Sequence, residues 1–577
     1  MLKEELKKLI SQKWNKISKK NDWPLIIKWQ DIPLENQAEN RYGDYSSPLA
    51  FILSKKTKEN PLSIAELLKN EMTNISPSLI SKIEIAGGGY LNFFVSQEKL
   101  AEKLKEAYQK KEKFGFSSEG KNKKIIVDYS SPNIAKPMHI GHLRSTIIGE
   151  ALSNLYEFLG YKVVRWNYLG DWGTQFGKLI ASYKLWGSEK AIKENAINNL
   201  LALYVRFHKE EEKNPKLEKI GQEEFKKLEE GDKENKRFWL WFKKASWKEF
   251  EKIYQALNIK FDVVLGESFF NQKALSIISF LKKKKIAEPS DGALIVPLDK
   301  FGLPPALIQK SDEATLYLTR ELAALKYRLE KYQPKKIIYV VGNEQDLHFK
   351  QLSALVKILG WGKKTELVHI KFGLVLSNDK KKLSTRKGEI VDLKEVINEA
   401  KEKAKKIIKE KHPQWPDKKI QKTGQIIAIG ALKFNDLKEF RTADLVFNWE
   451  KMLDFSANSS VYLQYTYARI NKIIAKAKRI GEYDLKLLNY PLEKLLIKKI
   501  IDFPEEIKNS AENYAPNNLA GFLLALADLT NKYYETVPVL KEKNKKRLNS
   551  QLVLLKTTAS ILKTGLKILG IETLREI

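Results

Sequence analysis

The 577-residue sequence contains no cysteine. Disulfide bonds and thiolate metal sites are therefore excluded. No apolar run reaches the roughly 18–20 residues that cross a bilayer. The N-terminus begins an amphipathic helix and lacks the apolar core of a signal peptide. We therefore expect a cytoplasmic protein that makes no membrane contact.

Acidic residues are few compared with basic ones. Lysine and arginine number 103 against 71 aspartates and glutamates, which gives a formal net charge of +32. Such an excess attracts polyanions. Lysine far outnumbers arginine, however, so part of the excess reflects a biased composition, and the charge alone indicates nucleic acid only weakly. The length predicts three or four domains.

The character of the sequence changes several times along the chain. Residues 1 to about 110 mix helical and strand patterns, and residues 111–123 resemble a linker. A strand–helix pattern starts at residue 124. A segment from about 185 to 260, rich in Glu, Lys, Trp and Leu, has helical periodicity and predicts a helical insertion. Further strands are expected at 162–166, 293–296, 337–341 and 367–370, and from about 425 the pattern is almost entirely helical.

The most informative segment lies between a predicted strand and a predicted helix. The strand-like run 124–129 is followed by residues 130–142, which contain the pattern H-x-G-H at His139, Gly141 and His142. In open α/β sheets nucleotides bind where such strands end, and the following helix offers free N–H groups to phosphate. Two imidazoles there can donate to phosphoryl oxygens during attack on the α-phosphorus. Gly141 leaves room for a flat ligand to approach the backbone.

A second candidate is the basic stretch 380–388, K-K-K-L-S-T-R-K-G. Dense positive charge together with hydroxyl groups suits a triphosphate. Seen alone, the stretch is more typical of an exposed basic loop in a lysine-rich protein than of a phosphate site.

Together the two segments resemble the H-I-G-H and K-M-S-K-S elements of class I aminoacyl-tRNA synthetases. Thr385 stands where that class has a second lysine, which helps to stabilise the pyrophosphate leaving group. Arginyl-tRNA synthetases often have S-T-R at this place and a lysine just before the first element. Lys136 occupies that place here.

The resemblance to arginyl-tRNA synthetases extends over nearly the whole chain. Residues 167–177 are similar to the family's G-D-W-G-T-Q-F-G element, and residues 315–323 to Y-x-T-R-D-x-A, with Glu321 in place of the usual Asp. The remaining similar segments are 42–45 and 86–93 in the N-terminal part, 342–349 with Q-x-x-H-F, and 462–470 with Y-x-Q-Y-x-x-A-R.

The resemblance implies a role for each matching position. Catalytic roles fall to His139, His142, Lys136, Lys382, Ser384 and Arg386, and ATP binding to His139, Gly141, His142 and Lys382. Arginine would be bound by Asp128, Ser130, Asn133, Glu267, Tyr317, Glu321 and Gln345, and tRNA by Gln464, Tyr465 and Arg469. The implied cofactor is ATP with Mg²⁺. We expect no protein-only metal site, no zinc and no organic cofactor.

Several of these positions have a plain structural alternative. Glu321 can instead form a structural ion pair, and Asp128 can be a polar strand end. Asn133 and Gln345 are also typical of capping or core hydrogen bonds. Tyr465 and Arg469 share a helix face with Tyr462, which also fits core packing; stacking on unpaired anticodon bases is the functional alternative.

We therefore predict a multidomain α/β protein with three units. Residues 1–112 form an α+β N-terminal domain that binds tRNA. Residues 122–424 form a Rossmann-type parallel-sheet catalytic domain with a helical insertion at about 185–285. Residues 425–577 form an all-α anticodon-binding domain. The function that the resemblance implies is to activate L-arginine with ATP and transfer it to the 3′ end of tRNA-Arg. The resemblance also implies that activation waits for tRNA, and we expect a monomer.

Three alternatives stay open. A nucleotidyltransferase of the H-x-G-H type would not need the helical C-terminal domain or the two glutamates 267 and 321. A synthetase for another amino acid is the second. Cysteine specificity usually uses a zinc site that this chain cannot build, and the large editing insertion of the isoleucine, valine and leucine enzymes does not fit in 577 residues. A non-catalytic tRNA-binding paralogue is the third, kept open by Thr385.

Overall fold

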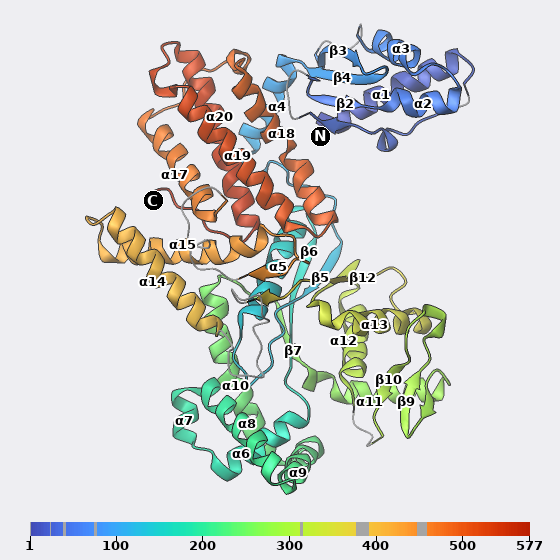
Figure 1. Ribbon diagram of the computed structural model, residues 1–577, viewed down its shortest axis with the longest axis vertical. Helices are drawn as coiled ribbons and strands as arrows, with labels where there is room; N and C mark the ends of the chain where they lie inside the picture. The colour runs from blue at the N-terminus through green and yellow to red at the C-terminus, as the bar shows by residue number, and fades with distance from the viewer. Residues whose placement is uncertain are drawn as a thin grey trace.

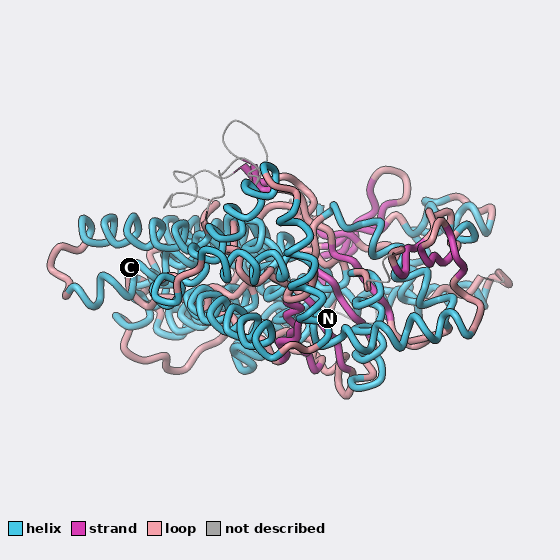
Figure 2. Tube along the Cα trace, turned by 90° about the horizontal axis from the view of Figure 1, so that it is seen from below, coloured by secondary structure: helices cyan, strands magenta, loops and turns pink. Residues whose placement is uncertain are grey.

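The computed structural model describes residues 2–23, 25–37, 42–73, 78–311, 315–376, 392–446 and 458–577. The predicted fold class is confirmed, because the structure contains an α+β N-terminal unit, a central parallel sheet and a helical C-terminal unit (Figure 1). Strands gather in the middle and on one side of the molecule, whereas the side that holds the C-terminus is helical (Figure 2). Within the described residues no helix is long and apolar enough to cross a membrane.

The N-terminal unit packs helices on a small antiparallel sheet. Helix α1 (Leu2–Lys20) buries Leu6, Ile10 and Trp14 at a helical spacing that forms one apolar stripe. The sheet order is β1-β2-β4-β3. The remaining elements are β1 (Glu35–Asn36), β2 (Tyr45–Ser47), α2 (Leu49–Thr57), α3 (Pro61–Thr73), β3 (Ile80–Ala86) and β4 (Tyr90–Val95). Helix α4 (Gln97–Lys110) leaves this unit and packs against the C-terminal helices α18 and α20.

The central sheet has five parallel strands in the order β12-β11-β5-β6-β7. They are β5 (Lys124–Asp128), β6 (Lys162–Leu169), β7 (Val263–Gly266), β11 (Lys336–Val340) and β12 (Glu366–Ile370). The chain proceeds from β5 to β6 on one side and adds β11 later on the other side. Such a change of direction opens a crevice at the carboxyl ends of the strands.

Helices flank the sheet and form the expected insertion. Helix α5 (Ile140–Phe158) follows β5, as predicted. The helices around the other strands are α11 (Asn271–Lys283), α12 (Tyr317–Tyr332) and α13 (Asp346–Leu359). The insertion consists of α6 (Thr174–Trp186), α7 (Glu189–Glu194), α8 (Ala196–Lys213), α9 (Lys216–Glu230) and α10 (Lys233–Ala256). Because β7 belongs to the central sheet, the range of about 185–285 that we expected for the insertion includes one strand of that sheet.

A second antiparallel sheet projects from the catalytic part. It consists of β8 (Glu288–Ser290), β9 (Ala293–Val296) and β10 (Ala306–Gln309) in the order β10-β9-β8. The sequence indicated only its middle strand, whose four residues Ala-Leu-Ile-Val are all apolar, whereas β8 is Glu-Pro-Ser and β10 ends in a glutamine.

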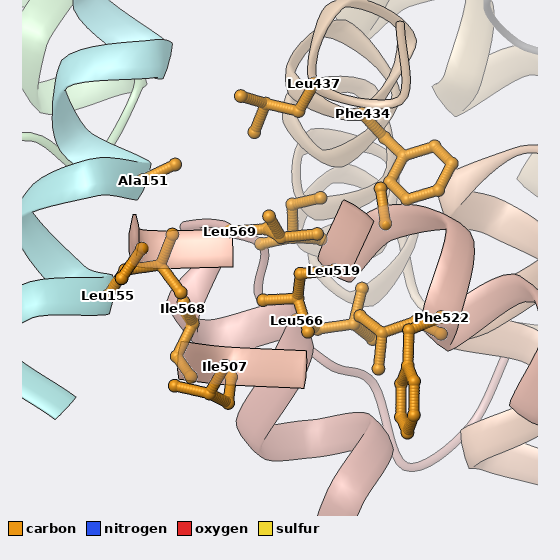
Figure 3. Close-up of a cluster of buried hydrophobic side chains, with 14 of the residues drawn as sticks. Ala151, Leu155, Phe434, Leu437, Ile507, Leu519, Phe522, Leu566, Ile568 and Leu569 are labelled. Atoms are coloured by element: carbon orange, nitrogen blue, oxygen red, sulfur yellow. The ribbon is translucent and has the colours of Figure 1, made fainter. Parts of the chain in front are cut away.

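The C-terminal unit is a helical bundle that packs directly on the catalytic domain. Its helices are α14 (Leu393–Lys411), α15 (Asp417–Leu437), α17 (Ser460–Lys476), α18 (Pro491–Glu512), α19 (Pro516–Thr536) and α20 (Lys545–Ile568). Ala151 and Leu155 of α5 lie beside Leu437, Ile507 and Ile568 in one buried cluster (Figure 3). The boundary that we expected at residue 424 falls within α15, since one helix runs through it.

Candidate active site

One cavity of about 550 Å³ lies at the carboxyl ends of the central strands. All seven residues expected to bind arginine line it, together with His139, Gly141 and His142. A larger cavity of about 710 Å³ lies at the amino ends of the strands, beside Lys124 and Lys335. None of the predicted site residues line it. The cavity at the carboxyl ends is therefore the candidate active site.

The two H-x-G-H histidines begin helix α5. His139 is the N-cap, and its Nδ1 accepts the backbone N–H of Gly141 at 3.1 Å. The backbone N–H of His139 donates to Nδ1 of His142, also at 3.1 Å. Burial lowers the pKa of His142 to about 3. Because both Nδ1 atoms accept hydrogen bonds, each ring carries its proton on Nε2, the atom that can donate to a phosphoryl oxygen.

The structure shows a steric reason for glycine at position 141 that the sequence did not reveal. A Cβ atom at this position would lie 2.9 Å from Cε1 of His139 and 3.0 Å from its Nδ1. The two histidine rings lie 4.0 Å apart between centroids. Glycine therefore lets the His139 ring fold back onto the first turn of α5.

A buried group of three charges forms the floor of the site. Arg328 of α12 donates to Oδ2 of Asp128 at 2.6 Å and to Oε1 of Glu321 at 3.0 Å. All three residues are at most 4% exposed. Burial raises the pKa of both carboxyl groups, and the Arg328 guanidinium opposes that shift. With both carboxylates ionised, the group carries one negative charge in excess.

Glu267 forms a second ion pair at the end of β7. Arg320 donates to Oε2 of Glu267 from Nε at 2.9 Å and from Nη2 at 2.8 Å. Burial raises the pKa of Glu267 to about 7 against the effect of Arg320. All described hydrogen bonds to this carboxyl group use Oε2, so Oε1 keeps its acceptor capacity.

Aromatic side chains complete the acidic end of the pocket. The ring of Tyr317 lies 4.7 Å from that of His348, and burial lowers the pKa of His348 to about 4. Tyr168, which lines the cavity, has a buried hydroxyl without a hydrogen-bond partner among the described residues. The same holds for Nε2 of His348. Such buried polar atoms are costly unless a ligand or water satisfies them.

The strand-to-helix loop holds Ser130 and Asn133. The Ser130 hydroxyl accepts from Thr146 Oγ1 at 2.8 Å and lies 2.8 Å from the Tyr254 hydroxyl. A Cβ atom at Gly170 would collide with Oδ1 of Asn133, so glycine is required for Asn133 to lie in this place. Gln345, in the turn before α13, also lines the cavity.

Lys136 is not among the cavity-lining residues. Its Nζ lies 4.9 Å from the centroid of the Tyr204 ring on α8 of the insertion. Burial lowers the pKa of Lys136.

The predicted residues Lys382, Ser384 and Arg386 lie outside the described residues. Before this gap, β13 (Val375–Leu376) pairs with β14 (Leu445–Val446). After it, Asp392 is bridged to His139, and Leu393 donates to the carbonyl oxygen of Met138 at 2.9 Å.

The three predicted tRNA contacts have different environments on α17. Tyr465 is 46% exposed, and the Arg469 guanidinium lies 4.0 Å from the centroid of the Tyr534 ring. Gln464 is completely buried, and its Nε2 donates to the carbonyl oxygen of Glu572 at 2.7 Å. Gln464 thus takes part in the packing of the domain, and the exposed position is Tyr465.

Two buried arginines were missed by the sequence analysis. Arg328 lies seven residues after Glu321, so two helical turns place both on one face of α12. Arg144 on α5 is 1% exposed and pairs with Asp436 of α15 at 3.1 Å. It also donates to the carbonyl oxygens of Gly373 and Ala443, both at 2.9 Å. Charged residues on an otherwise apolar helix face were the signal for both.

Among the described residues no group of three or more His, Asp or Glu side chains is placed to hold a metal ion.

Family models match three consecutive parts of the chain. Residues 103–449 match "tRNA synthetases class I (R), catalytic domain", residues 463–577 the "DALR anticodon binding domain", and residues 4–95 the "Arginyl tRNA synthetase N terminal domain". Fold, pocket and models together define a class I aminoacyl-tRNA synthetase.

The most similar curated proteins and solved structures include enzymes specific for arginine. The arginine–tRNA ligase of Enterococcus faecalis is 42% identical over 545 residues, covering 94% of this chain and 95% of its own. The arginine–tRNA ligase of Streptococcus pneumoniae is 41% identical over 572 residues, which cover 98% of this chain and 99% of the relative. The arginyl-tRNA synthetase in the crystal structure from Plasmodium falciparum is 28% identical in sequence, with a TM-score of 0.81. The match covers 99% of this chain and 98% of that chain. The chain belongs to the arginyl-tRNA synthetase family and is an arginine–tRNA ligase by activity.

Proposed function

We propose that the cavity at the carboxyl ends of the sheet is where L-arginine reacts with ATP to give arginyl-adenylate, before transfer to the 3′ end of tRNA-Arg. The observation that carries this assignment is the buried group of Asp128, Glu321 and Arg328, with its excess negative charge. Its two carboxylates, Asp128 and Glu321, line the same cavity as the two imidazole donors of the H-x-G-H segment.

In the first step a carboxylate oxygen of arginine attacks the α-phosphorus, and the bond to the pyrophosphate oxygen breaks. The Nε2–H groups of His139 and His142 donate to the phosphoryl oxygens as negative charge develops. Lys136, together with Lys382, Ser384 and Arg386, stabilises the leaving pyrophosphate. In the second step a tRNA hydroxyl attacks the activated carbonyl carbon, and AMP leaves.

The substrate guanidinium lies at the acidic end of the pocket. Its planar fork of donors matches carboxylate acceptors. Oε1 of Glu267 and the Glu321 carboxylate accept from it, and Tyr317 lines this subsite. Binding restores neutrality to the Asp128–Arg328–Glu321 group. Ser130, Asn133 and Gln345 hold the α-amino and carboxylate ends at the other wall.

Neutral citrulline has nearly the shape of arginine but would leave the buried carboxylates uncompensated, so it is rejected. Lysine retains the charge but lacks the fork.

Mg²⁺ enters with ATP, bound to the oxygens of the triphosphate. It offsets triphosphate charge when bound.

The rest of the chain binds tRNA. Tyr465 and Arg469 are the proposed anticodon contacts, and the unit of residues 1–112 contacts the outer part of the tRNA. We keep the divisions at 112 and 122 as proposed domain limits and give up the division at 424, which falls within helix α15. A cytoplasmic location follows from the supply of charged tRNA to translation, and a monomer of 66.6 kDa is expected by light scattering.

The test of the acidic subsite is calorimetric titration with arginine and citrulline. Glu321→Gln removes the excess charge without changing side-chain shape, and we expect arginine affinity to fall about 10- to 100-fold. Glu330→Gln, an exposed position on the same helix, is the matched control. Circular dichroism confirms that both variants fold. Equal arginine affinity in Glu321→Gln and the wild type would contradict the assignment.

A further inference from the structure

The helical insertion holds the loop between β5 and α5 at three places. The Tyr254 hydroxyl of α10 lies 2.8 Å from Oγ of Ser130. The backbone N–H of Ala135 donates to Oγ of Ser246, also on α10, at 3.0 Å. The third contact is between Lys136 and the Tyr204 ring of α8. The insertion therefore forms one wall of the loop that precedes His139.

The third contact differs from the other two in kind. Ser246 and Tyr254 are buried and bind backbone or neutral groups, so they fix the shape of the loop. Tyr204 is half-buried and contacts a charged side chain with the face of its ring, which is a cation–π interaction. Among the described residues no carboxylate lies within ion-pair distance of Lys136. Its ammonium group thus stays unneutralised.

Other residues of the insertion hold the Tyr204 ring in place. The His208 ring packs edge-on against it at 4.5 Å between centroids. Nδ1 of His208 lies 3.1 Å from Oε2 of Glu211, and Glu211 pairs with Lys178 of α6 at 2.7 Å. The ring therefore has a fixed place relative to the α6 helix, and the position of the Lys136 ammonium is fixed with it.

We propose that Tyr204 is a positioning residue for Lys136, which rests on the proposed role of Lys136 in pyrophosphate release. The ring restricts the ammonium to one region without cancelling its charge. A carboxylate in its place would neutralise the lysine and hold it too strongly. Because a cation–π contact is weaker than a contact with phosphate, Lys136 can exchange the ring for the triphosphate. Through this contact the insertion takes part in adenylate formation.

The test compares Tyr204→Leu with Tyr204→Phe in arginine-dependent ATP–pyrophosphate exchange, using the full chain with tRNA. Leucine removes the aromatic face, and we expect kcat to fall about 3- to 10-fold, with the KM for arginine unchanged. Phenylalanine keeps the face and should restore kcat to within about twofold. Tyr183→Leu, a half-buried tyrosine of α6 that packs on Phe238, is the matched control for damage to the insertion.

A double-mutant cycle with Lys136→Ala separates positioning from a structural effect. If Tyr204 acts through Lys136, Tyr204→Leu has no further effect on kcat in the Lys136→Ala background. An equal loss in both backgrounds, or a similar loss in Tyr183→Leu, overturns the proposal. Wild-type exchange by Lys136→Ala would overturn the role of Lys136 itself and the proposal with it. Wild-type exchange by Tyr204→Leu alongside an impaired Lys136→Ala overturns only the role of Tyr204.

Discussion

At the scale of single residues, two buried arginines of the chain control the charge that a substrate meets. Arg328 neutralises one of the two carboxylates Asp128 and Glu321, and Arg320 neutralises Glu267. The pocket therefore keeps one excess negative charge instead of three. A monovalent guanidinium compensates that charge without leaving buried ions unpaired.

This balance predicts a pH dependence of arginine binding. Burial raises the pKa of Glu267 and of Asp128 to about 7. As the pH falls through 7, the carboxyls take up protons, which stabilises the folded chain down to the ordinary carboxyl range but removes the charge that attracts arginine. We expect kcat/KM for arginine to fall below about pH 7. His142 contributes no step there, since its pKa is about 3.

The check is the pH profile of kcat/KM for arginine between pH 5.5 and 8.5. Glu267→Gln should give a lower profile with a weaker pH dependence, because glutamine imitates the protonated acid. A flat wild-type profile across this range would argue against the raised carboxyl pKa values.

At the scale of elements, helix α5 connects the first motif with the C-terminal unit. Its N-terminus carries His139 and His142, and two residues further Arg144 binds Asp436 of α15 and the carbonyl oxygens of residues 373 and 443. The same helix contributes Ala151 and Leu155 to the buried cluster between the units (Figure 3). The strands β13 and β14 pair beside it.

Arg144→Leu should therefore destabilise the chain by about 3–5 kcal/mol, because Asp436 would remain buried without its partner. Arg144→Lys keeps the charge but not the five-donor fork, and should lower the free energy of unfolding by less than Arg144→Leu does. Urea unfolding followed by circular dichroism measures both, and adding Asp436→Asn should recover part of the loss. A leucine variant as stable as the wild type would show that the ion pair contributes nothing to docking.

The sequence predicted the elements of the first motif well, because strand 124–128 and helix 140–158 carry strong, local periodic patterns. It also indicated the residues Asp128, Glu267 and Glu321 at the acidic end of the cavity, but not Tyr168, which lines the cavity with them. It could not indicate the ion pair of Glu267 with Arg320, since that pair depends on how the end of β7 and α12 meet in space. The contact between Lys136 and Tyr204, on separate elements, likewise leaves no pattern in the sequence. The pair of Glu321 with Arg328 lies within α12, and its spacing of seven residues was a signal that we missed.

At the scale of the whole molecule, polar contacts join the N-terminal unit to the C-terminal helices. Lys498 of α18 binds Asp44 at 2.8 Å, and Glu505 of the same helix binds Lys3 at 3.0 Å. Asn36 donates to Asp502 at 3.1 Å. Both units belong to one chain with a net charge of +32. This charge favours a polyanion that spans more than one unit.

We therefore expect tRNA affinity to depend steeply on salt. Four or more phosphate contacts would lower it about 100-fold between 50 and 200 mM salt. Fluorescence anisotropy with labelled tRNA measures this slope, and arginine affinity over the same salt range is the control, since its site is buried. A tRNA affinity that does not change with salt would contradict the role assigned to the net charge.

The most direct test of the central claim is ATP–pyrophosphate exchange with arginine, with and without tRNA. The pocket chemistry predicts exchange with arginine and none with citrulline or lysine, and the family resemblance predicts that exchange requires tRNA. Exchange without tRNA would retain the activity but remove the coupling. No exchange with arginine under either condition, while tRNA still binds, would contradict the assignment of this cavity as the site of arginine activation.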